Sequence, residues 1–256
     1  MLPMITLKNF CYENLYKNLT LSILKNKITV ISGANDCGKT LLIRILNREI
    51  ITSNIIIIDN KEINKYRIED YSKLVQSVIP LEITYEESTI EEELLYYNKN
   101  KEELDNIIKG LKIKKIIHKK TNNLTAKEII LSQIAITLAK KPKILLIDNL
   151  RMYLTEKETK EILEFLKKFQ KDQELTIVIT TVHLEESLVA DYLYIIGNKS
   201  IALEGKPIDV LQNDNRINKL GLNLPFMIDL SVKLRDYGLI KEIELNKNRM
   251  VENLWK

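Results

Sequence analysis

The sequence predicts an α/β fold with a parallel core sheet, and three observations support this fold class. A chain of 256 residues with 45% hydrophobic residues can bury one large core. Apolar runs near residues 54, 143 and 175 are rich in Ile, Leu and Val, as expected for strands that are covered on both faces. Between the first two of these runs, residues 85–140 change to a helical periodicity rich in Glu, Lys and Leu, which predicts a helical insertion between strands.

The individual strands are predicted from short apolar runs that are rich in β-forming residues. These runs are residues 4–10, 18–23, 27–31, 54–58, 73–79, 143–148, 175–181, 191–196 and 200–204. Within the helical insertion, Thr89 directly precedes an Ile-Glu-Glu-Glu-Leu-Leu run. We expect Thr89 to be the N-cap of the first inserted helix, because a threonine hydroxyl can accept a hydrogen bond from the first turn.

The run at residues 27–31 leads into a loop with a phosphate-binding pattern. The loop reads Gly33, Ala34, Asn35, Asp36, Cys37, Gly38, Lys39 and Thr40, which fits G-x-x-x-x-G-K-[ST]. The two glycines would let the backbone turn its N–H groups toward a β-phosphate at the start of a helix. Lys39 would neutralise phosphate charge, and the Thr40 hydroxyl would bind Mg²⁺. Because the chain has only 7 glycines, an ordinary glycine turn rarely matches this pattern by chance, and we predict a nucleotide-binding P-loop.

The apolar run at residues 143–148 ends in a carboxylate, Asp148. At the carboxyl end of a parallel strand, this side chain would face the phosphate site and hold Mg²⁺ through water. A strand-terminal aspartate can also simply cap a helix. Its combination with the P-loop favours the Mg²⁺ role.

Composition and charge restrict the other function classes. The 39 basic and 35 acidic residues give a net charge of +4 without a block of like charges, which argues against nucleic acid as the main ligand. No apolar run approaches the ~18 residues of a membrane span and no signal peptide is visible, so we expect a cytosolic chain or one attached to a membrane through a partner. Cys11 and Cys37 form no C-x-x-C pattern and suggest a reducing compartment.

The long separation of Lys39 from Asp148, with a helical segment between them, resembles the nucleotide-binding subunits of ABC transporters. The resemblance covers nearly the whole chain. It implies a P-loop NTPase fold of ABC type, with a RecA-like core sheet, an antiparallel β region at the N-terminus and a helical subdomain at about residues 80–140. The nucleotide-binding domain would then span residues 1–210, and its ligands would be ATP and Mg²⁺.

Two further nucleotide contacts follow from the same resemblance. Lys73-Leu74-Val75-Gln76 is similar to the family's Q-loop, so Gln76 would bind Mg²⁺ and transmit closure to a membrane partner. Phe10-Cys11-Tyr12 is similar to the family's adenine-stacking segment, which makes Tyr12 the candidate ring. A tyrosine of the hydrophobic core is an equally good interpretation of Tyr12.

One segment resembles the family's Leu-Ser-Gly-Gly-Gln signature but differs from it in chemistry. It reads Leu124, Thr125, Ala126, Lys127 and Glu128. In the family, the serine hydroxyl and the glycine N–H groups contact the γ-phosphate held by the opposite subunit of a head-to-tail dimer. Thr125 keeps a hydroxyl, but side chains at Ala126 and Lys127 hinder close backbone approach, and Glu128 adds a carboxylate. We therefore expect a weakened contact with the opposite subunit.

The residues that cleave ATP in the family are also replaced. Asn149 stands where a glutamate orients the attacking water, and an amide cannot accept a proton at neutral pH. Thr155 replaces the aspartate of the D-loop, and Val182 occupies the position of the switch histidine. His183 lies one residue later, where a one-residue bulge would be needed to bring it within reach. Since the P-loop is intact, the resemblance implies ATP binding with weak hydrolysis.

The C-terminal region is similar to that of the energy-coupling factor (ECF) transporter ATPases. It contains Gly221-Leu222-Asn223-Leu224-Pro225, then a leucine-spaced run that ends at Gly238, then a last short helical pattern. In that family such segments help two ATPases dimerise, so residues 211–256 would form a C-terminal helical dimerisation region. A generic pair of amphipathic helices that closes the domain is the other interpretation.

The resemblance as a whole implies the ATP-binding subunit of an importer for a vitamin or a metal ion. The chain would be the degenerate partner in an ATPase pair at the inner face of the cell membrane. Its partners would be a second ABC ATPase, a transmembrane coupling protein and a substrate-binding membrane subunit. The alternative is a nucleotide-dependent regulatory or assembly protein of the same fold outside transport. A small-molecule kinase is disfavoured, because such enzymes lack the helical insertion.

Overall fold

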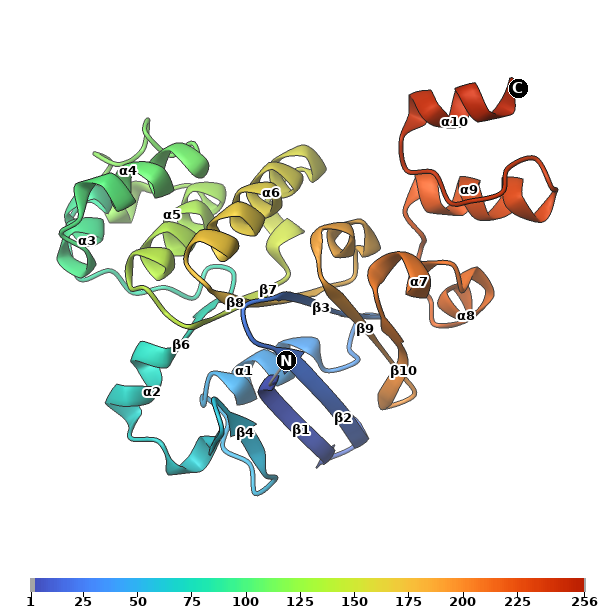
Figure 1. Ribbon diagram of the computed structural model, residues 1–256. Helices are drawn as coiled ribbons and strands as arrows, with labels where there is room; N and C mark the ends of the chain where they lie inside the picture. Colours follow the sequence, from blue (N-terminus) through green and yellow to red (C-terminus); the bar gives the residue numbers. More distant parts are fainter. Residues whose placement is uncertain (1–2, 256) are drawn as a thin grey trace.

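The strands of the molecule form two separate sheets (Figure 1). The structure is a computed structural model that describes residues 3–255. Within these residues the larger sheet has six strands in the order β10-β9-β3-β8-β7-β6. They are β3 (Ile28–Gly33), β6 (Val75–Val78), β7 (Ile144–Asp148), β8 (Thr176–Thr181), β9 (Tyr192–Gly197) and β10 (Ser200–Gly205). All neighbours pair in parallel except β9 and β10, so the predicted parallel core sheet is confirmed.

The smaller sheet is antiparallel and has the order β2-β1-β4-β5. Its strands are β1 (Pro3–Tyr12), β2 (Tyr16–Leu24), β4 (Ile56–Ile58) and β5 (Lys61–Glu62). The prediction that the run near residue 54 belongs to the parallel sheet is wrong, because β4 pairs antiparallel with β1. Ile56 and Ile58 are fully buried, whereas Ile57 between them is only partly buried. This alternation is typical of a strand with one covered face.

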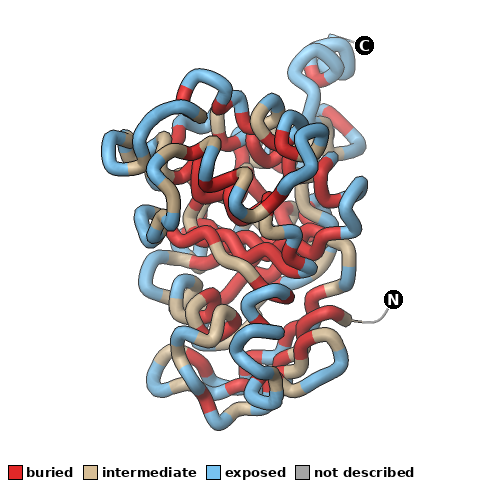
Figure 2. Tube along the Cα trace, turned by 90° about the vertical axis from the view of Figure 1, so that its left-hand side faces the viewer, coloured by how far each residue is buried: buried red, intermediate tan, exposed pale blue. Residues whose placement is uncertain are grey.

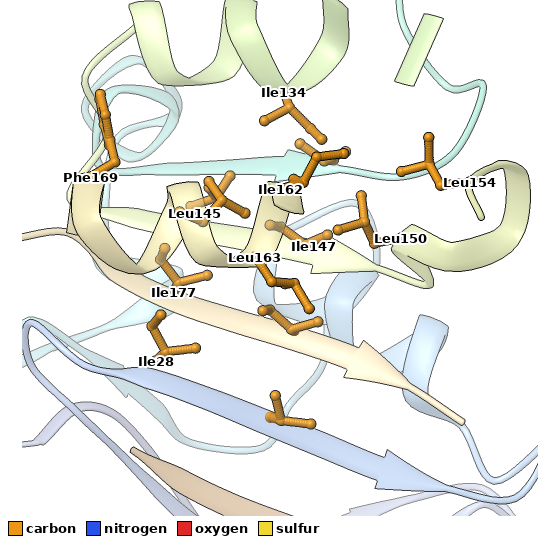
Figure 3. Close-up of a cluster of buried hydrophobic side chains, with 14 of the residues drawn as sticks. Ile28, Ile134, Leu145, Ile147, Leu150, Leu154, Ile162, Leu163, Phe169 and Ile177 are labelled. Carbon is orange, nitrogen blue, oxygen red and sulfur yellow. The ribbon is translucent and has the colours of Figure 1, made fainter. Parts of the chain in front are cut away.

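Alternate residues of the larger sheet pack into two hydrophobic clusters, one on each face. In β7, Leu145 and Ile147 belong to the first cluster, whereas Ile144 and Leu146 belong to the second. Figure 3 shows the first cluster, in which side chains of β3, β7 and β8 meet those of α6 (Glu156–Asp172). The buried segments run through the middle of the molecule (Figure 2). Burial of both faces explains why the sequence of β7 is continuously apolar before Asp148.

Helices and short 3₁₀ turns connect the strands. The helices up to β7 are α1 (Lys39–Leu46), α2 (Ile68–Leu74), α3 (Ile90–Tyr97), α4 (Lys101–Gly110) and α5 (Ala126–Ala139). The 3₁₀ turns are η1 (Ile63–Lys65), η2 (Thr121–Asn123), η3 (Leu150–Tyr153) and η4 (Leu184–Val189). Helices α3, α4 and α5 lie together at one end of the molecule (Figure 1). They occupy the part of the chain where the sequence predicts a helical insertion.

Three helices begin with the same capping box. Thr89, Thr125 and Thr155 each cap the helix that follows, and the carboxylate of a glutamate three residues later accepts a hydrogen bond from the backbone N–H of that threonine. This reciprocal pair satisfies two N–H groups that a helix start otherwise leaves without partners. The predicted N-cap at Thr89 is confirmed. The boxes at α5 and α6 were readable from the T-x-x-E spacing but are not among the predicted caps.

After β10, the described residues up to 255 form four helices, α7 (Pro207–Leu211), α8 (Asp214–Lys219), α9 (Phe226–Asp236) and α10 (Lys247–Leu254). Helices α9 and α10 extend away from the sheets (Figure 1). Several large apolar side chains are exposed on and between them, including Phe226, Tyr237, Leu239 and Trp255. In residues 3–255, no helix is both long enough and apolar enough to cross a membrane.

The two sheets are joined by hydrogen bonds between β2 and the β9–β10 hairpin. The Tyr194 hydroxyl accepts from the Ser22 N–H at 3.1 Å and donates to the Ser22 carbonyl at 2.9 Å. At the other end of β2, the Lys17 N–H donates to the Lys199 carbonyl at 2.8 Å. These contacts fix the position of the β1–β2 hairpin relative to the larger sheet.

Candidate nucleotide-binding site

The loop between β3 and α1 has two positions at which the backbone geometry admits only glycine. Gly38 has φ of 98°, and a Cβ atom there would lie 2.7 Å from the Tyr16 hydroxyl oxygen. A Cβ atom at Gly33 would lie 2.6 Å from the Cys37 Sγ and 2.9 Å from the carbonyl oxygen of Ile196. Neither distance is tolerable for a side chain, so both glycines of the predicted pattern are required by the local geometry.

Lys39 is the first residue of α1, and its side chain folds back over the loop. The Nζ atom donates to the carbonyl oxygens of Gly33 and Ala34 at 2.7 Å each. The positive charge is thereby held at the mouth of the loop, next to the N-terminus of α1. Both the ammonium group and the helix dipole favour an anion at this point.

Asp148 lies next to the loop because β7 and β8 end at the same edge of the sheet as β3. One oxygen, Oδ2, accepts from the Thr40 hydroxyl at 2.7 Å, and the other accepts from the Thr180 hydroxyl. Asp148 is only 5% exposed, so its two oxygens depend on these hydroxyl partners. The predicted pairing of Asp148 with the P-loop therefore has a direct geometric basis, although Thr180 is not among the predicted residues.

A cavity of about 420 Å³ opens at this edge of the sheet. Ligand pockets typically have volumes of ~300–1,000 Å³. Its walls come from the β1–β2 turn, the P-loop and α1, and the ends of β7 and β8. The lining residues are Leu15, Asn35, Asp36, Gly38, Lys39, Thr40, Leu41, Asp148, Asn149 and Val182.

Tyr16 supports the phosphate-binding loop through a hydrogen bond to its backbone. Tyr16 is not among the site residues that the sequence predicts. Its ring is buried, and its hydroxyl donates to the Gly38 carbonyl at 2.6 Å. Burial also raises the pKa of the Tyr16 phenol, so the hydroxyl keeps its proton and remains a donor. The alternation of buried Leu19, Leu21 and Ile23 in β2 does not extend to Tyr16, and nothing local in the sequence indicates its partner 22 residues away.

Tyr12 lies near the cavity but is not among its lining residues. Its ring stacks on that of Phe10, with centroids 6.4 Å apart and planes 5° from parallel. It ends β1, and Leu15 in the following turn does line the cavity. The structure thus gives Tyr12 a packing partner within the chain and a partly buried place against the second hydrophobic cluster.

The structure does not bring Gln76, a predicted Mg²⁺ ligand, to the cavity that Thr40 and Asp148 line. In the β6–β7 register Gln76 pairs with Leu145, three residues before Asp148. Its Nε2 atom donates to the Ser72 carbonyl, and its side chain lines a different cavity. The last pair of this register is Val78 with Ile147, the residue before Asp148. Strand β6 contains only four residues, so the three positions that separate Leu145 from Asp148 are nearly its whole length. Gln76 therefore lies toward the opposite end of the strands from Asp148.

The cavity that Gln76 lines is a groove between α2, β6 and the end of α1, with a volume of about 350 Å³. Two large apolar side chains stand at its edge with little cover, Ile51 at 80% and Ile68 at 79% exposure. Arg48 also lines it, and its guanidinium lies over the ring of Tyr71. The groove combines apolar rims with polar walls, which is a composition found at protein interfaces.

Asn149 and Val182 both line the nucleotide cavity, at the two positions where the resemblance expects catalytic groups. Asn149 has a left-handed backbone, with φ of 44°, and its N–H donates to the Thr180 carbonyl at 2.9 Å. Asparagine tolerates this conformation better than most residues. Val182 carries no polar group, so neither position offers a proton acceptor.

His183 is not brought into the cavity. The register of β8 with β3 and with β7 is continuous up to Thr181 and Thr180, so β8 itself contains no bulge. The His183 N–H donates to the Thr181 hydroxyl at 2.9 Å. Burial, followed by the charge of Arg151, lowers the pKa of the imidazole, which keeps it neutral. The substitute role considered for His183 is therefore not supported.

Thr125, Ala126, Lys127 and Glu128 form the start of α5 and lie outside the cavity. Their polar groups are engaged within the chain. Glu128 accepts from the Thr125 N–H at 3.0 Å and forms an ion pair with Lys119 at 2.7 Å. Lys127 forms an ion pair with Glu158 of α6. Thr155, at the D-loop position, is the N-cap of α6.

Glu186 is a buried carboxylate close to the end of β8 to which no role was assigned. It is 4% exposed, and among the described residues neither of its oxygens has a hydrogen-bond partner. Burial raises the pKa of Glu186 to about 7. The Thr181 hydroxyl is close enough to oppose this shift, but it does not reach hydrogen-bond geometry. Glu186 is consequently a mixture of charged and neutral forms near neutral pH.

The residues of the cavity fit ATP and Mg²⁺. The glycine loop and Lys39 line the cavity, and Lys39 supplies a cation for a phosphate. The hydrogen bond between Thr40 and Asp148 holds their two oxygen atoms 2.7 Å apart. At this separation both oxygens can face one Mg²⁺ ion, either as direct ligands or through bound water. In residues 3–255, no group of three or more His, Cys, Asp or Glu side chains is arranged so that it could hold a metal ion. Mg²⁺ needs no such group, because substrate phosphates and water complete its coordination.

A P-loop beside a strand-end aspartate, on a parallel sheet with helices inserted between β6 and β7, defines a P-loop NTPase of ABC type. The family profile for ABC transporters matches residues 16–150, which is more than half of the chain. The chain belongs to the ABC transporter family. Both the predicted fold class and the predicted family are confirmed, and membership implies ATP binding with Mg²⁺ in general terms.

Individual relatives agree with this assignment. The chain is 28% identical to the ECF transporter ATP-binding protein EcfA1 of Mycoplasmopsis pulmonis, over 90% of this chain and 93% of that protein. It is 24% identical to EcfA1 of Oceanobacillus iheyensis, over 93% and 90% of the two chains. The structure of CbiO1 from Clostridium perfringens, part of the ABC transporter complex CbiONQ, matches with a TM-score of 0.73 and 23% identity over 90% of this chain and 99% of that chain. That structural match supports the fold.

Proposed function

We propose that this chain is the ATP-binding subunit of an ECF-type importer and the degenerate partner in its ATPase pair. One observation carries the proposal: Lys39, Thr40 and Asp148 share a cavity with Asn149 and Val182. The groups that bind phosphate and Mg²⁺ are present, whereas the groups that would activate water are replaced by an amide and a valine. A general base typically contributes ~10²- to 10⁴-fold to a rate, so turnover at this site is slow.

In this function, ATP acts as a ligand that promotes assembly. Lys39 and the N–H groups of the loop bind the phosphates, and the Thr40 and Asp148 oxygens hold Mg²⁺ directly or through water. The second ABC ATPase then closes over the nucleotide, with residues 211–256 adding contacts between the two subunits. The exposed apolar side chains of α9 and α10 support a contact there, since monomers rarely leave such side chains uncovered.

The membrane partners would dock on the groove lined by Ile51, Ile68 and Gln76. The two isoleucines are nearly fully exposed and provide an apolar contact that a helix of a transmembrane coupling protein can cover. Gln76 then serves at this interface rather than at Mg²⁺. The chain would lie at the inner face of the membrane through this partner, and a separate membrane subunit would select the vitamin or metal ion.

Nucleotide binding tests the first part of the proposal. Titration calorimetry of the full chain with ATP and Mg²⁺ should show binding that is lost in Lys39→Ala, with Lys17→Ala on the exposed side of β2 as the matched control. Phosphate release should stay at least 100-fold below that of an ABC ATPase with an intact general base. Robust phosphate release by the isolated chain that disappears in Lys39→Ala would contradict the degenerate role.

Co-purification from native membranes tests the second part. We expect an affinity-tagged full chain to bring down an ABC ATPase and a multi-span membrane protein, and Ile51→Glu combined with Ile68→Glu to lose the membrane protein. The matched control is Ile208→Glu, an exposed isoleucine on α7, outside the groove. A wild-type chain that binds ATP but recovers no membrane protein would support a regulatory or assembly protein outside transport instead.

A further inference from the structure

The carboxylate of Glu158 is shared between two segments that face the proposed partner ATPase. One oxygen, Oε2, accepts from the Thr155 N–H at 3.0 Å and from the Thr155 hydroxyl at 2.9 Å. The other oxygen, Oε1, accepts from the Lys127 ammonium. Thr155 stands at the D-loop position and Lys127 in the segment that resembles the signature. A single side chain on the first turn of α6 therefore contacts both.

These contacts keep Glu158 charged. The Lys127 ammonium and then the Thr155 backbone lower the pKa of Glu158 to about 2, so it is a carboxylate at all physiological pH values. Lys127 forms its ion pair with Glu158 alone, since it contacts no other carboxylate in the described residues. The pair remains within reach of solvent, with side-chain exposures of 47% for Lys127 and 31% for Glu158.

We propose that Glu158 is an autoinhibitory contact for the α5 N-terminus: it holds the Lys127 ammonium inside the chain until the nucleotide of the partner ATPase displaces it. The proposal rests on the proposed function, in which the start of α5 faces that nucleotide. In the family, glycine N–H groups make this contact. Here the side chains of Ala126 and Lys127 block the backbone, and the Thr125 hydroxyl is the N-cap of α5, so the Lys127 ammonium is the cation that is left to meet a phosphate.

Lys127 can exchange Glu158 for a phosphate at a small cost in free energy. When Lys127 leaves, Glu158 keeps its two hydrogen bonds from Thr155 and does not become an unpaired buried charge. The exposed ion pair contributes only about two- to fivefold to an equilibrium constant. A terminal phosphate carries more charge than one carboxylate and has three acceptor oxygens, so it competes successfully for a lysine.

The test uses two substitutions with opposite expected signs. Glu158→Gln keeps an oxygen that can cap Thr155 but releases Lys127, so ATP-dependent association with the partner ATPase should strengthen by about two- to fivefold. Lys127→Met removes the cation and should weaken it by a similar factor. The double variant should behave like Lys127→Met. Association is measured by sedimentation of the full chain with the ABC ATPase that co-purifies with it, with and without ATP and Mg²⁺.

A second ion pair on α6 provides the matched control. Lys112 and Glu161 are 2.7 Å apart and join the same helix to the segment after α4, but they contact neither Thr155 nor the start of α5. Lys112→Met and Glu161→Gln should leave association unchanged. A merely structural role for Glu158 would make Glu158→Gln and Lys127→Met change association in the same direction, and that result would overturn the proposal.

ATP binding by the chain alone separates this proposal from the function on which it rests. All variants should bind ATP at the Lys39 loop with wild-type affinity. If the wild type forms no ATP-dependent pair at all, the proposed function fails and this inference with it. If the pair forms and Glu158→Gln does not strengthen it, only the inference fails.

Discussion

Glu186 should make the stability of the protein depend on pH, and Glu186→Gln isolates this effect. The carboxyl has a pKa of 4.5 when unperturbed and about 7 in the folded protein. Between these values the folded state binds the proton and the unfolded state does not, so stability falls as pH rises. From pH 5 to pH 8, this single group removes about 2.5 kcal/mol from the free energy of unfolding. Above pH 8 the loss is complete.

Thermal unfolding between pH 5 and pH 8 measures the effect. With an unfolding entropy of about 2.1 cal/mol/K per residue, a change of about 2.5 kcal/mol corresponds to roughly 5 °C in Tm for a chain of this length. Glutamine has nearly the same shape and does not titrate. The difference in Tm between Glu186→Gln and the wild type should therefore grow by about 5 °C in favour of the variant over this range.

Comparison of the two proteins cancels all other titrations. Glu164→Gln removes an equal charge from the exposed side of α6 and should show a difference in Tm that stays flat across the same pH range. If the difference for Glu186→Gln is also flat, then Glu186 is charged in the folded protein at pH 5 and the reasoning from its burial is refuted.

Two further predictions concern the nucleotide cavity. Asn149→Glu should raise phosphate release by the assembled complex by only about tenfold, because Val182 is unchanged and a glutamate is disfavoured by about 1 kcal/mol at the left-handed backbone of this position; a rise of 100-fold or more would contradict this. Tyr16→Phe should lower the free energy of unfolding by about 1 kcal/mol and weaken ATP binding several-fold, because the Gly38 carbonyl loses its phenolic donor. Denaturant titration and calorimetry measure both effects, and wild-type values in both would show that this hydrogen bond does not shape the loop.

The P-loop and Asp148 could be predicted from the sequence because their information is local. The loop pattern occupies eight adjacent residues, and a buried strand that ends in a carboxylate is visible in six. Parallel strands bring their carboxyl ends to one edge of the sheet, so the two features had to meet. The hydrogen bond between Thr40 and Asp148 shows that they do.

The sequence failed where long-range pairing decides the outcome. The prediction of Gln76 at Mg²⁺ rests on its neighbours in the chain, Lys73 to Val75. Its position in the fold depends instead on the register between β6 and β7, which no local pattern determines. The isoleucine run of β4 suited either sheet, and its pairing with β1 settled the choice. The Tyr16 hydroxyl and the Lys127 ammonium likewise have partners that lie 22 and 31 residues away.

The hydrogen bonds that join β2 to the β9–β10 hairpin give the C-terminal helices a short route to the nucleotide. Helix α7 follows β10 directly, and the turn between β9 and β10 is joined to β2 by the hydrogen bond from the Lys17 N–H to the Lys199 carbonyl. Strand β2 begins with Tyr16, whose hydroxyl donates to the Gly38 carbonyl. These contacts connect α7–α10 to the phosphate loop through β-strands. The connection does not pass through the helices inserted between β6 and β7.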